Sequence, residues 1–446
     1  MSPSAPTRVF AALQQPAELL ICAAHVLDPR AGLDGHHDVL IRDGAIAELA
    51  PAGTLEAPPG AELIDGEGRH LFPGFVDPHV HLRTPGQEHK EDLQTGTRAA
   101  AAGGYCAVVA MPNTEPVLDD PALLRGLIAQ AQAQARIPVG FMPAISRGLE
   151  GLQLTDMAEL RDAGAVGFTD DGRPVSSAGL LRRALQYQRL CGGVLALHEE
   201  DPTLSAHGAM HEGEVSARLG VTGIPASSEA TMIARDALLA EQEGGRVHFQ
   251  HLSARSSIDA LAAARARGAR VSGEVSPHHL LLCDDAVESL DTRFKMNPPL
   301  RAPEDREALV AALRDGTIEC VATDHAPHSR DEKDVPFEQA PMGTTGLESA
   351  FAVLHSADIL PLATLIERLT AGAALLGLPT PRIAPGEPAN ATLIDLTTEW
   401  RVGESGYESR SENCCFAGRE VRGRVLLTLA AGAVAYRERT FALSAA

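Results

Sequence analysis

The fold is decided by the stretch Phe75-Val-Asp-Pro-His79-Val-His81-Leu-Arg83-Thr-Pro85. An apolar run ends here in two histidines separated by one residue, and side chains two residues apart on a β-strand point to the same side. His79 and His81 can therefore present their imidazoles together, as Zn²⁺ or a similar metal requires. A lone His-x-His is equally compatible with a polar strand end, so the pattern gains meaning only if other strands also end in ligands.

Length and charge exclude several classes of protein. The 446 residues can bury a barrel-sized core together with a smaller domain. A formal charge of −21, from 38 basic and 59 acidic residues, argues against a nucleic-acid or anionic-membrane surface. Residues 1–17 are rich in Ala, Ser, Pro and Gln and predict a loose extension rather than a signal peptide. Because no apolar segment approaches the length of a membrane span, we expect a cytoplasmic protein.

From residue 71 onward, short apolar segments alternate with segments of helical periodicity. Asp120 followed by Pro121 predicts a helix start, and Gly164 and Gly268 follow helical segments where a left-handed terminator is expected. This alternation predicts an α/β fold, a parallel sheet closed into a (β/α)₈ TIM-type barrel, with an open doubly wound sheet as the alternative. The eight predicted strands are 75–81, 106–111, 139–145, 165–169, 194–198, 247–251, 270–275 and 319–323.

The two ends of the chain share a different pattern, in which short strands alternate with Asp/Gly turns. The simplest interpretation is that both ends build one small β domain beside the barrel. We therefore expect a side domain from residues 18–70 and 379–446, and a barrel from residues 71–378. The strands predicted for the side domain are 19–24, 39–41, 45–49, 391–396, 415–416, 421–429 and 432–436.

Polar residues follow most of the predicted barrel strands, which is where barrel enzymes carry their catalytic groups. Burying so many polar groups without partners would cost several kcal/mol, so their convergence at one mouth indicates a site. The residues at these strand ends are His79, His81, Asn113, Asp170, Asp171, His198, His251, Asp324, His325 and His328.

Four histidines and two aspartates among these residues exceed what one tetrahedral Zn²⁺ requires, and they fit a pair of ions bridged by a carboxylate and a hydroxide. Such a pair polarises a carbonyl group and makes a nucleophile from water near neutral pH. The predicted chemistry is hydrolysis or its reverse, which also needs a residue that moves a proton to the departing nitrogen. We expect Asp324 in that role.

Five stretches give the chain a more specific resemblance. They are Pro73-Gly-Phe-Val-Asp-Pro-His-Val-His-Leu-Arg83, Met111-Pro-Asn-Thr114, Phe168-Thr-Asp-Asp-Gly172, Lys295-Met-Asn-Pro-Pro-Leu-Arg301 and Ala322-Thr-Asp-His-Ala-Pro-His328. In combination they resemble type I dihydroorotases of the amidohydrolase superfamily, from about residue 18 to the end of the chain. The resemblance implies a metal-dependent barrel with a β-sandwich side domain that interconverts N-carbamoyl-L-aspartate and L-dihydroorotate in pyrimidine synthesis.

The resemblance also implies a set of metal ligands. In type I enzymes an aspartate and a hydroxide bridge two zinc ions, whereas relatives in other branches use a carboxylated lysine. Spacing relative to His198 favours Asp171 as this bridge, with Asp170 as the alternative. The remaining implied ligands are His79, His81 and Asp324 for the first ion, and His198 and His251 for the second.

Substrate contacts are implied in the same way. Arg83, Asn113 and His328 match positions that hold the substrate carboxylate, and an arginine can do this with two parallel hydrogen bonds. Asn297 matches a position that binds the pyrimidine ring. The pair Met342-Gly343, in the long loop 329–346, corresponds to a Phe-Gly or similar pair that contacts the ring through backbone groups, so the methionine departs from the family pattern.

Other titratable residues receive no such role. His278 and His279 are expected to pack near the site rather than to bind metal, and His325 is expected to point away from it. His211 is expected on the surface. Glu91, in the loop after the first strand, is as compatible with solvent or a neighbouring loop as with substrate.

Two alternative functions stay open. Dihydropyrimidinases, hydantoinases and allantoinases share the barrel and the His-x-His pattern, but they give no reason for Arg83 and Asn113 to hold a ring carboxylate. A catalytically silent structural partner of aspartate carbamoyltransferase would be expected to have lost ligands, whereas all six are present. The expected partners are a small-molecule substrate and further copies of the chain, with an association with aspartate carbamoyltransferase left open.

Overall fold

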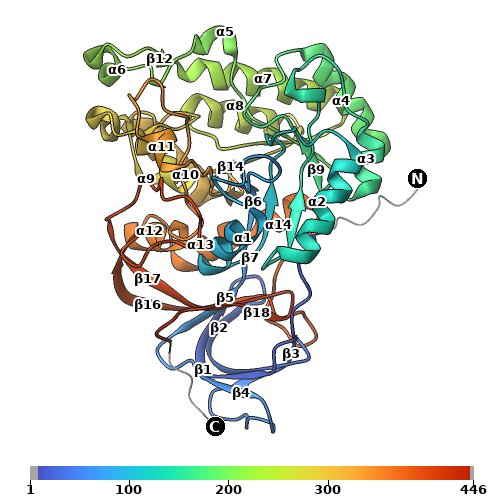
Figure 1. Cartoon of the computed structure of the whole chain (residues 1–446), viewed down its shortest axis with the longest axis vertical. Helices are drawn as coiled ribbons and strands as arrows, with labels where there is room; N and C mark the ends of the chain where they lie inside the picture. The colour runs from blue at the N-terminus through green and yellow to red at the C-terminus, as the bar shows by residue number, and fades with distance from the viewer. Residues whose placement is uncertain (1–8, 442–446) are drawn as a thin grey trace.

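The computed structural model describes residues 9–441, which form a barrel of parallel strands beside a separate, mostly antiparallel sheet (Figure 1). Each barrel strand overlaps one of the eight predicted segments. The barrel strands are β6 (Phe75–Val80), β7 (Tyr105–Ala110), β8 (Val139–Phe141), β9 (Gly167–Thr169), β10 (Val194–Leu197), β13 (Arg246–Phe249), β14 (Arg270–Val275) and β15 (Cys320–Val321).

Hydrogen bonds close these strands into a barrel. Strands β6, β7 and β8 pair in parallel, and β9, β10, β13, β14 and β15 form a second parallel group. The amide of Val166 donates to the carbonyl of Phe141 at 3.0 Å, and the amide of His81 donates to the carbonyl of His325 at 2.9 Å, so both gaps between the groups are bridged. The sheet is therefore a closed TIM-type barrel rather than an open doubly wound sheet.

Helices surround the barrel, and several begin and end where the sequence predicts. The Asp120 side chain accepts from the amides of Ala122 and Leu123 at the start of the helix Pro121–Gln134, and the predicted terminators Gly164 and Gly268 both have positive φ. The main helices are α1 (Leu93–Ala102), α2 (Pro121–Gln134), α3 (Met157–Ala163), α4 (Ala178–Cys191), α7 (Ala226–Glu243), α8 (Arg255–Ala266), α10 (Pro303–Asp315), α12 (Ala350–Ala357), α13 (Leu362–Thr370) and α14 (Gly372–Leu376).

Shorter elements lie in the loops at the mouth and along the barrel. They are α5 (Pro202–Ser205), α6 (Glu214–Leu219), α9 (Pro277–Leu281), α11 (Arg330–Lys333), the short strands β11 (Met210–His211) and β12 (Gly223–Ile224), and three single 3₁₀ turns at Arg147–Leu149, Asp284–Ser289 and Thr292–Phe294.

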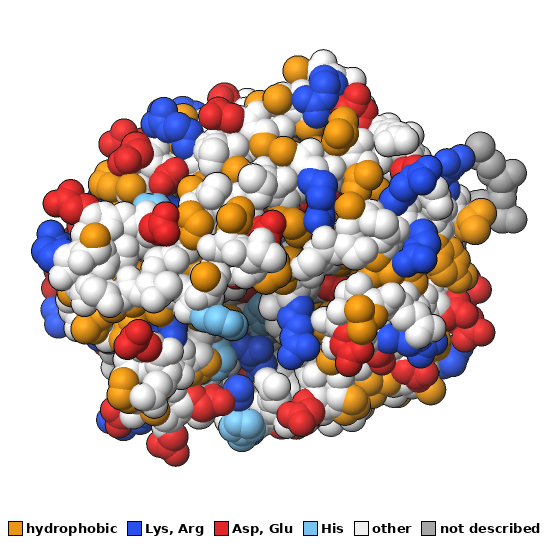
Figure 2. All heavy atoms as spheres, turned by 90° about the horizontal axis from the view of Figure 1, so that it is seen from above, with side chains coloured by type: hydrophobic (Ala, Val, Ile, Leu, Met, Phe, Trp, Pro, Cys, Tyr) orange, Lys and Arg blue, Asp and Glu red, His pale blue; other side chains and the backbone are white. Residues whose placement is uncertain are grey.

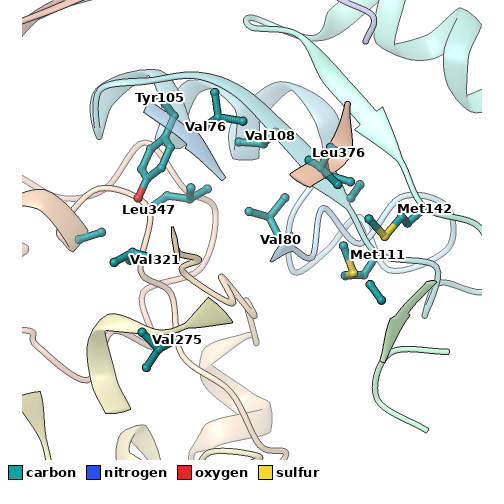
Figure 3. Packing of buried hydrophobic residues seen from close by; sticks show 14 of the residues in the cluster. Val76, Val80, Tyr105, Val108, Met111, Met142, Val275, Val321, Leu347 and Leu376 are labelled. Carbon is teal, nitrogen blue, oxygen red and sulfur yellow. The ribbon is translucent and has the colours of Figure 1, made fainter. Parts of the chain in front are cut away.

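Buried apolar side chains pack around the strands below the mouth. Val80, Val275 and Val321 come from three different strands and belong to one buried apolar cluster that also contains Met111 and Met142 (Figure 3). Close packing of this kind fixes the strands relative to one another. The polar residues that follow each strand are thereby held in one place.

The two chain ends build the second sheet together, and Figure 1 shows the blue and red strands side by side. Its order is β18-β17-β16-β5-β1-β2-β3, with β4 beside β1, and the two ends meet where β16 pairs antiparallel with β5. The strands are β1 (Leu19–Asp28), β2 (Leu33–Arg42), β3 (Ala45–Pro51), β4 (Glu62–Asp65), β5 (His70–Pro73), β16 (Ala391–Arg401), β17 (Glu420–Ala430) and β18 (Ala433–Arg437).

This sheet differs from the prediction in two details. Strand β5 carries the sheet to Pro73, past the boundary expected at residue 70. The predicted strand at 415–416 does not form, because both residues lie in the long connection between β16 and β17 and Cys415 donates its amide to the Thr344 hydroxyl instead of to a strand.

The start of the described chain is attached to the barrel. Phe10 and Val139 exchange two backbone hydrogen bonds of 2.9 and 2.8 Å, which differs from the loose extension predicted for residues 1–17, since part of it docks on β8. Residues 1–8 of that prediction lie outside the described residues. Between residues 9 and 441, none of the helices combines the length and the apolar character needed to cross a bilayer.

Candidate metal centre

His79 and His81, at the end of β6, turn one ring nitrogen each toward the middle of the barrel mouth. Both are buried. The Nδ1 atom of His79 lies 2.7 Å from Oε1 of Glu274, and Nδ1 of His81 lies 2.9 Å from Oδ1 of Asn113. Because Nδ1 lies beside an oxygen that can accept its proton in each case, the neutral form of each ring would leave the Nε2 lone pair free for a metal, as in a metal-binding histidine.

Asp171 lies between this pair of histidines and a second pair. Its Oδ1 is 3.4 Å from Nε2 of His79, 3.7 Å from Nε2 of His251 and 3.8 Å from Nδ1 of His198, and its Oδ2 is 3.5 Å from Nε2 of His81. His198 follows β10 and His251 follows β13, so three strand ends supply the four imidazoles. The carboxylate of Asp171 is common to both pairs.

Asp170, the alternative bridge, is used elsewhere. Its Oδ1 accepts from the amides of Ile145 and Ser146 at 2.8 and 2.9 Å, and its Oδ2 accepts from the Ser146 hydroxyl. Burial raises the pKa of Asp170 to about 6, although these hydrogen bonds act to lower it. The structure therefore brings Asp171, and not Asp170, to the histidines.

Asp324, after β15, completes the cluster. Its Oδ1 lies 3.0 Å from Nε2 of His81 and 3.5 Å from Nε2 of His79. Its backbone has a φ of 47°, and His251 and Arg83 also have positive φ, of 32° and 57°. Such backbone conformations cost about 1–3 kcal/mol each in non-glycine residues and gather at functional sites, where the surrounding structure imposes them.

The electrostatics of this cluster favour a cation. Burial alone would lower the pKa of His79, but the carboxylates of Asp171, Glu274 and Asp324 outweigh it and hold that pKa well above its usual value. Burial alone would raise the pKa of Asp324, but the neighbouring His79 and His81 hold it below its usual range, and the pKa of Asp171 is lowered in the same way. The carboxylates are therefore ionised at neutral pH.

The ligand chemistry also fits a metal. Nε2 of His79 is buried and has no hydrogen-bond partner, which is costly unless something else satisfies it. Among the described residues, two of the three groups whose ligand atoms lie within 4.8 Å of one another belong to this cluster: His79, His81 and Asp171, and Asp171, His198 and His251. Imidazole nitrogens with one shared carboxylate could hold metal ions of the zinc type.

Arg83 and His328 meet beside the cluster. Nε of Arg83 donates to the carbonyl of Pro327 at 3.1 Å, and one Nη lies 3.4 Å from Nε2 of His328. Burial and the Arg83 charge lower the pKa of His328 to about 2, so its ring is neutral. No carboxylate among the described residues forms an ion pair with Arg83, which leaves this buried cation available to an anionic ligand.

The two predicted asparagines contact ligand residues. Asn113 bonds His81 and also donates to Oδ2 of Asp171 at 3.3 Å. Asn297 donates to Oε2 of Glu200 at 2.8 Å, and its amide lies 3.5 Å from Nε2 of His198. Both amides are therefore next to the predicted metal ligands, and Asn113 helps to orient the His81 ring.

Met342 and Gly343 lie at the same mouth, but their backbone groups already have partners. The Met342 carbonyl accepts from His328 at 2.9 Å, the Gly343 amide donates to the Lys295 carbonyl at 2.8 Å, and the Gly343 carbonyl accepts from Asn413 at 3.2 Å. The second lone pair of each of these carbonyls remains available to a substrate. Gly343 has a φ of +128°, and a Cβ there would lie 2.6 Å from that of Ala326.

Two acidic residues at the cluster were missed from the sequence. Glu274 holds His79, and Glu200 lies 3.7 Å from Nε2 of His198 while it accepts from Asn297. Glu274 is an acidic residue inside the predicted strand 270–275, and Glu200 follows two residues after the strand-end residue His198. Both are signals that could have identified them, since a buried carboxylate needs a partner.

The titratable residues to which the sequence assigns no site role lie around the cluster and in neighbouring loops. His278 and His279 are buried in α9, and His279 bonds the Pro298 carbonyl at 2.9 Å. His325 points away from the ligands, toward Glu91 at 3.3 Å, and Glu91 is fully buried between loops. The expectation of a surface His211 is wrong, because it is buried against Arg301 at 3.3 Å.

Basic side chains gather near the barrel mouth. Figure 2 shows histidine and Lys/Arg side chains in a hollow on the face seen from above. A cavity of about 620 Å³ has His328, Lys333, Arg330 and Arg410 in its wall, together with acidic residues that include Asp291 and Asp334. The wall of this cavity therefore carries charges of both signs.

Comparison with known sequences gives close relatives over nearly the whole chain. A family model described as dihydro-orotase-like matches residues 68–257. The dihydroorotase of Anaeromyxobacter dehalogenans is 46% identical over 426 residues, covering 94% of this chain and 98% of that protein. The dihydroorotase of Pelotomaculum thermopropionicum is 45% identical over 427 residues, covering 95% and 99%.

Solved structures share the fold at lower identity. An L-hydantoinase (dihydropyrimidinase) from Arthrobacter aurescens superposes with a TM-score of 0.82 at 24% identity, covering 94% of this chain and 96% of that chain. A D-hydantoinase from a Thermus species gives 0.78 at 26% identity, covering 96% and 97%. The TIM-barrel architecture is thus that of the amidohydrolases, while the more similar sequences are those of dihydroorotases.

Proposed function

The chain belongs to the dihydroorotase family of the amidohydrolase superfamily and interconverts N-carbamoyl-L-aspartate and L-dihydroorotate in pyrimidine synthesis; we propose that it does so at the strand ends described above. The observation that carries this proposal is the position of Asp171, whose carboxylate lies between two pairs of histidines from three strand ends. This geometry suits a reaction at a cyclic amide that needs two cations close together.

We infer that the metal is zinc and that two ions bind, bridged by Asp171. His79 and His81, with Asp324, would hold one ion, and His198 and His251 would hold the other. When bound, the ions would polarise the amide carbonyl and lower the pKa of a water molecule. The buried Nε2 of His79, which has no hydrogen-bond partner, supports this assignment.

Asp324 is the proposed proton carrier. Its carboxylate is ionised and lies beside the predicted reaction centre, so it can accept a proton. In the hydrolytic direction Asp324 takes the proton of the attacking water and delivers it to the ring nitrogen that leaves. In the biosynthetic direction it accepts the proton of the ureido nitrogen as the ring closes, and gives it to the carboxyl oxygen that leaves as water.

Substrate is held by the groups around this centre. Arg83, without an ion-pair partner among the described residues, and the neutral His328 beside it would bind the substrate carboxylate together with Asn113. Asn297 would bind the pyrimidine ring, with the second lone pairs of the Met342 and Gly343 carbonyls. Arg83 would therefore bind the carboxylate of the substrate, and a substrate without a carboxylate would leave Arg83 without a partner.

The competing function is that of a hydantoinase or dihydropyrimidinase, the names carried by the solved structures of similar fold. Arg83 distinguishes the two, because their rings need no buried arginine for a carboxylate. The test is turnover of carbamoyl aspartate, dihydroorotate, hydantoin and dihydrouracil by the same preparation, before and after chelation. We expect turnover of the first two only, and loss of it on chelation; preferential turnover of hydantoin or dihydrouracil would contradict the proposal.

The domain division is part of the same proposal. We propose that residues 18–70 and 379–446 form a side domain of the β-sandwich type, supported by an apolar core of its own that includes Ile21, Ile41 and Leu393. A cytoplasmic location, assembly of several copies and association with aspartate carbamoyltransferase stay predictions of the sequence.

A further inference from the structure

The connection between β16 and β17, residues 402–419, is long for two adjacent antiparallel strands and reaches the barrel mouth. We call residues 409–415 the strap. The Ser411 hydroxyl donates to the Lys90 carbonyl at 2.7 Å, and the Arg410 guanidinium donates to the Glu88 carbonyl at 2.8 Å. The side domain thus sends a segment onto the loop that follows β6.

Asn413 is the residue of the strap that enters the site. It is 5% exposed. Its Oδ1 accepts from the His328 amide at 3.0 Å, and its Nδ2 donates to the carbonyls of Ala326 and Gly343 at 3.1 and 3.2 Å. If the Asn413 amide were flipped, its NH₂ group would face the His328 N–H donor and its oxygen would face two carbonyl oxygens. All three hydrogen bonds therefore require the same orientation of the amide.

The backbone of the strap adds to this connection. The Thr344 hydroxyl donates to the Asn413 carbonyl at 3.0 Å and accepts from the Cys415 amide at 2.9 Å. The segments 326–328 and 343–344, which come from the two ends of the long loop after β15, are therefore both bonded to one residue of the side domain.

We propose that Asn413 is a positioning residue for substrate, which holds His328 and Gly343 at the distance that the substrate carboxylate and ring require. The proposal rests on the proposed function, because that function assigns His328 and Gly343 to the substrate. An error of about 1 Å in such groups weakens binding and orientation strongly. Asn413 bonds none of the metal-binding residues, so its effect should fall on substrate and not on metal.

The first test is Asn413→Asp, which keeps the acceptor for His328 and loses both donors. For hydrolysis of dihydroorotate by the full chain we expect KM to rise about tenfold and kcat to stay within about threefold, the pattern of lost substrate binding. Zinc content should match that of wild type. Glu412→Gln, which changes the exposed neighbour in the strap, is the matched control and should leave both constants unchanged.

A second variant tests the same positioning role if Asn413→Asp does not fold. Thr344→Val removes the hydroxyl between Asn413 and Cys415 at almost constant volume, and KM should again rise. An unchanged KM in the folded variants, or a loss of kcat and zinc with KM unchanged, would overturn the positioning role.

Failure of the proposed function gives a different result. Wild type would then bind zinc without turning over dihydroorotate, whatever the strap does. Hydrogen exchange of the His328 amide, which Asn413 protects, still decides in that case whether the strap holds the segment. Faster exchange in Asn413→Ala than in Glu412→Gln supports the connection, and equal exchange contradicts it.

Discussion

The Nδ1 atom of His79 lies 2.7 Å from Oε1 of Glu274, and this buried pair determines which nitrogen of His79 faces the metal site. The other oxygen of Glu274 accepts from Nε2 of His248 at 3.0 Å. Burial raises the pKa of Glu274, but the two histidines outweigh it and lower that pKa to about 2. Glu274 is therefore a fixed anion beneath the proposed ligands, and it makes His79 a stronger donor to a metal.

Replacement of Glu274 by Gln should weaken metal binding. Loss of a partner of this kind costs about 10–100-fold in metal affinity. Titration of the metal-free protein with zinc against a chelating indicator measures the change. Glu307→Gln, which alters an exposed carboxylate on α10, is the control and should bind zinc as wild type does. Equal affinity in Glu274→Gln and Glu307→Gln would show that Glu274 does not orient His79.

Asp324→Asn should separate catalysis from metal binding. The amide cannot take up a proton, so kcat should fall about 10²–10⁴-fold, the usual contribution of a general acid-base residue. Four histidines and Asp171 remain, so most of the zinc should be retained. Steady-state kinetics and elemental analysis of the same sample measure both quantities. The exposed Asp259→Asn on α8 is the control, and near-normal turnover by Asp324→Asn would refute the proton-carrying role.

Replacement by Asn should have different effects at the adjacent residues Asp170 and Asp171. Asp171→Asn removes the carboxylate shared by both histidine pairs and should lower the number of zinc ions bound. Asp170→Asn should keep the zinc and lower the free energy of unfolding by about 1–3 kcal/mol, because buried hydrogen bonds to Ile145 and Ser146 are disturbed. Metal analysis and denaturant unfolding distinguish the two. The reverse pattern would identify Asp170 as the bridge.

Lys333 should make stability depend on pH. Burial, assisted by the charge of Lys295, lowers the pKa of Lys333 to about 7 from its ordinary 10.5. Between these values the unfolded chain binds more protons than the folded one, so this group adds stability as pH rises from about 7 to about 10.5. The free energy of unfolding of wild type should therefore increase relative to Lys333→Met across that window.

Urea unfolding at several pH values measures this difference. Arg330→Met, which removes an exposed cation from the same short helix α11, is the control and should follow the wild-type curve. A difference between wild type and Lys333→Met that stays flat or falls with pH would contradict the lowered pKa.

The sequence predicts the parts of this molecule that local patterns encode. The βα alternation and the helix ends at Asp120 and Gly164 depend on neighbouring residues, so the barrel strands could be located in advance. The proposed ligands such as His79 and His198 could be named in advance because each directly follows an apolar run. Spacing favoured Asp171 over Asp170 as the bridge, but only the fold shows that Asp170 bonds Ser146 instead of the histidines.

The residues that support the site were not predictable in this way. Glu274 reaches His79 across 195 residues of sequence, and Asn413 reaches His328 across 85, so only barrel closure and the strap bring them together. The predicted strand at 415–416 was wrong for the same reason, since both residues are buried in the connection between β16 and β17 and not in a sheet. The docking of Phe10 on Val139 likewise depends on a contact between distant segments.

The most direct test of the account is an anomalous-scattering crystal structure of the zinc-loaded protein. We expect two zinc ions with ligands at about 2.0–2.2 Å, one beside His79 and His81, one beside His198 and His251, and the Asp171 carboxylate between them. Zinc bound away from these side chains, or a single ion that leaves His198 and His251 without metal, would contradict the account.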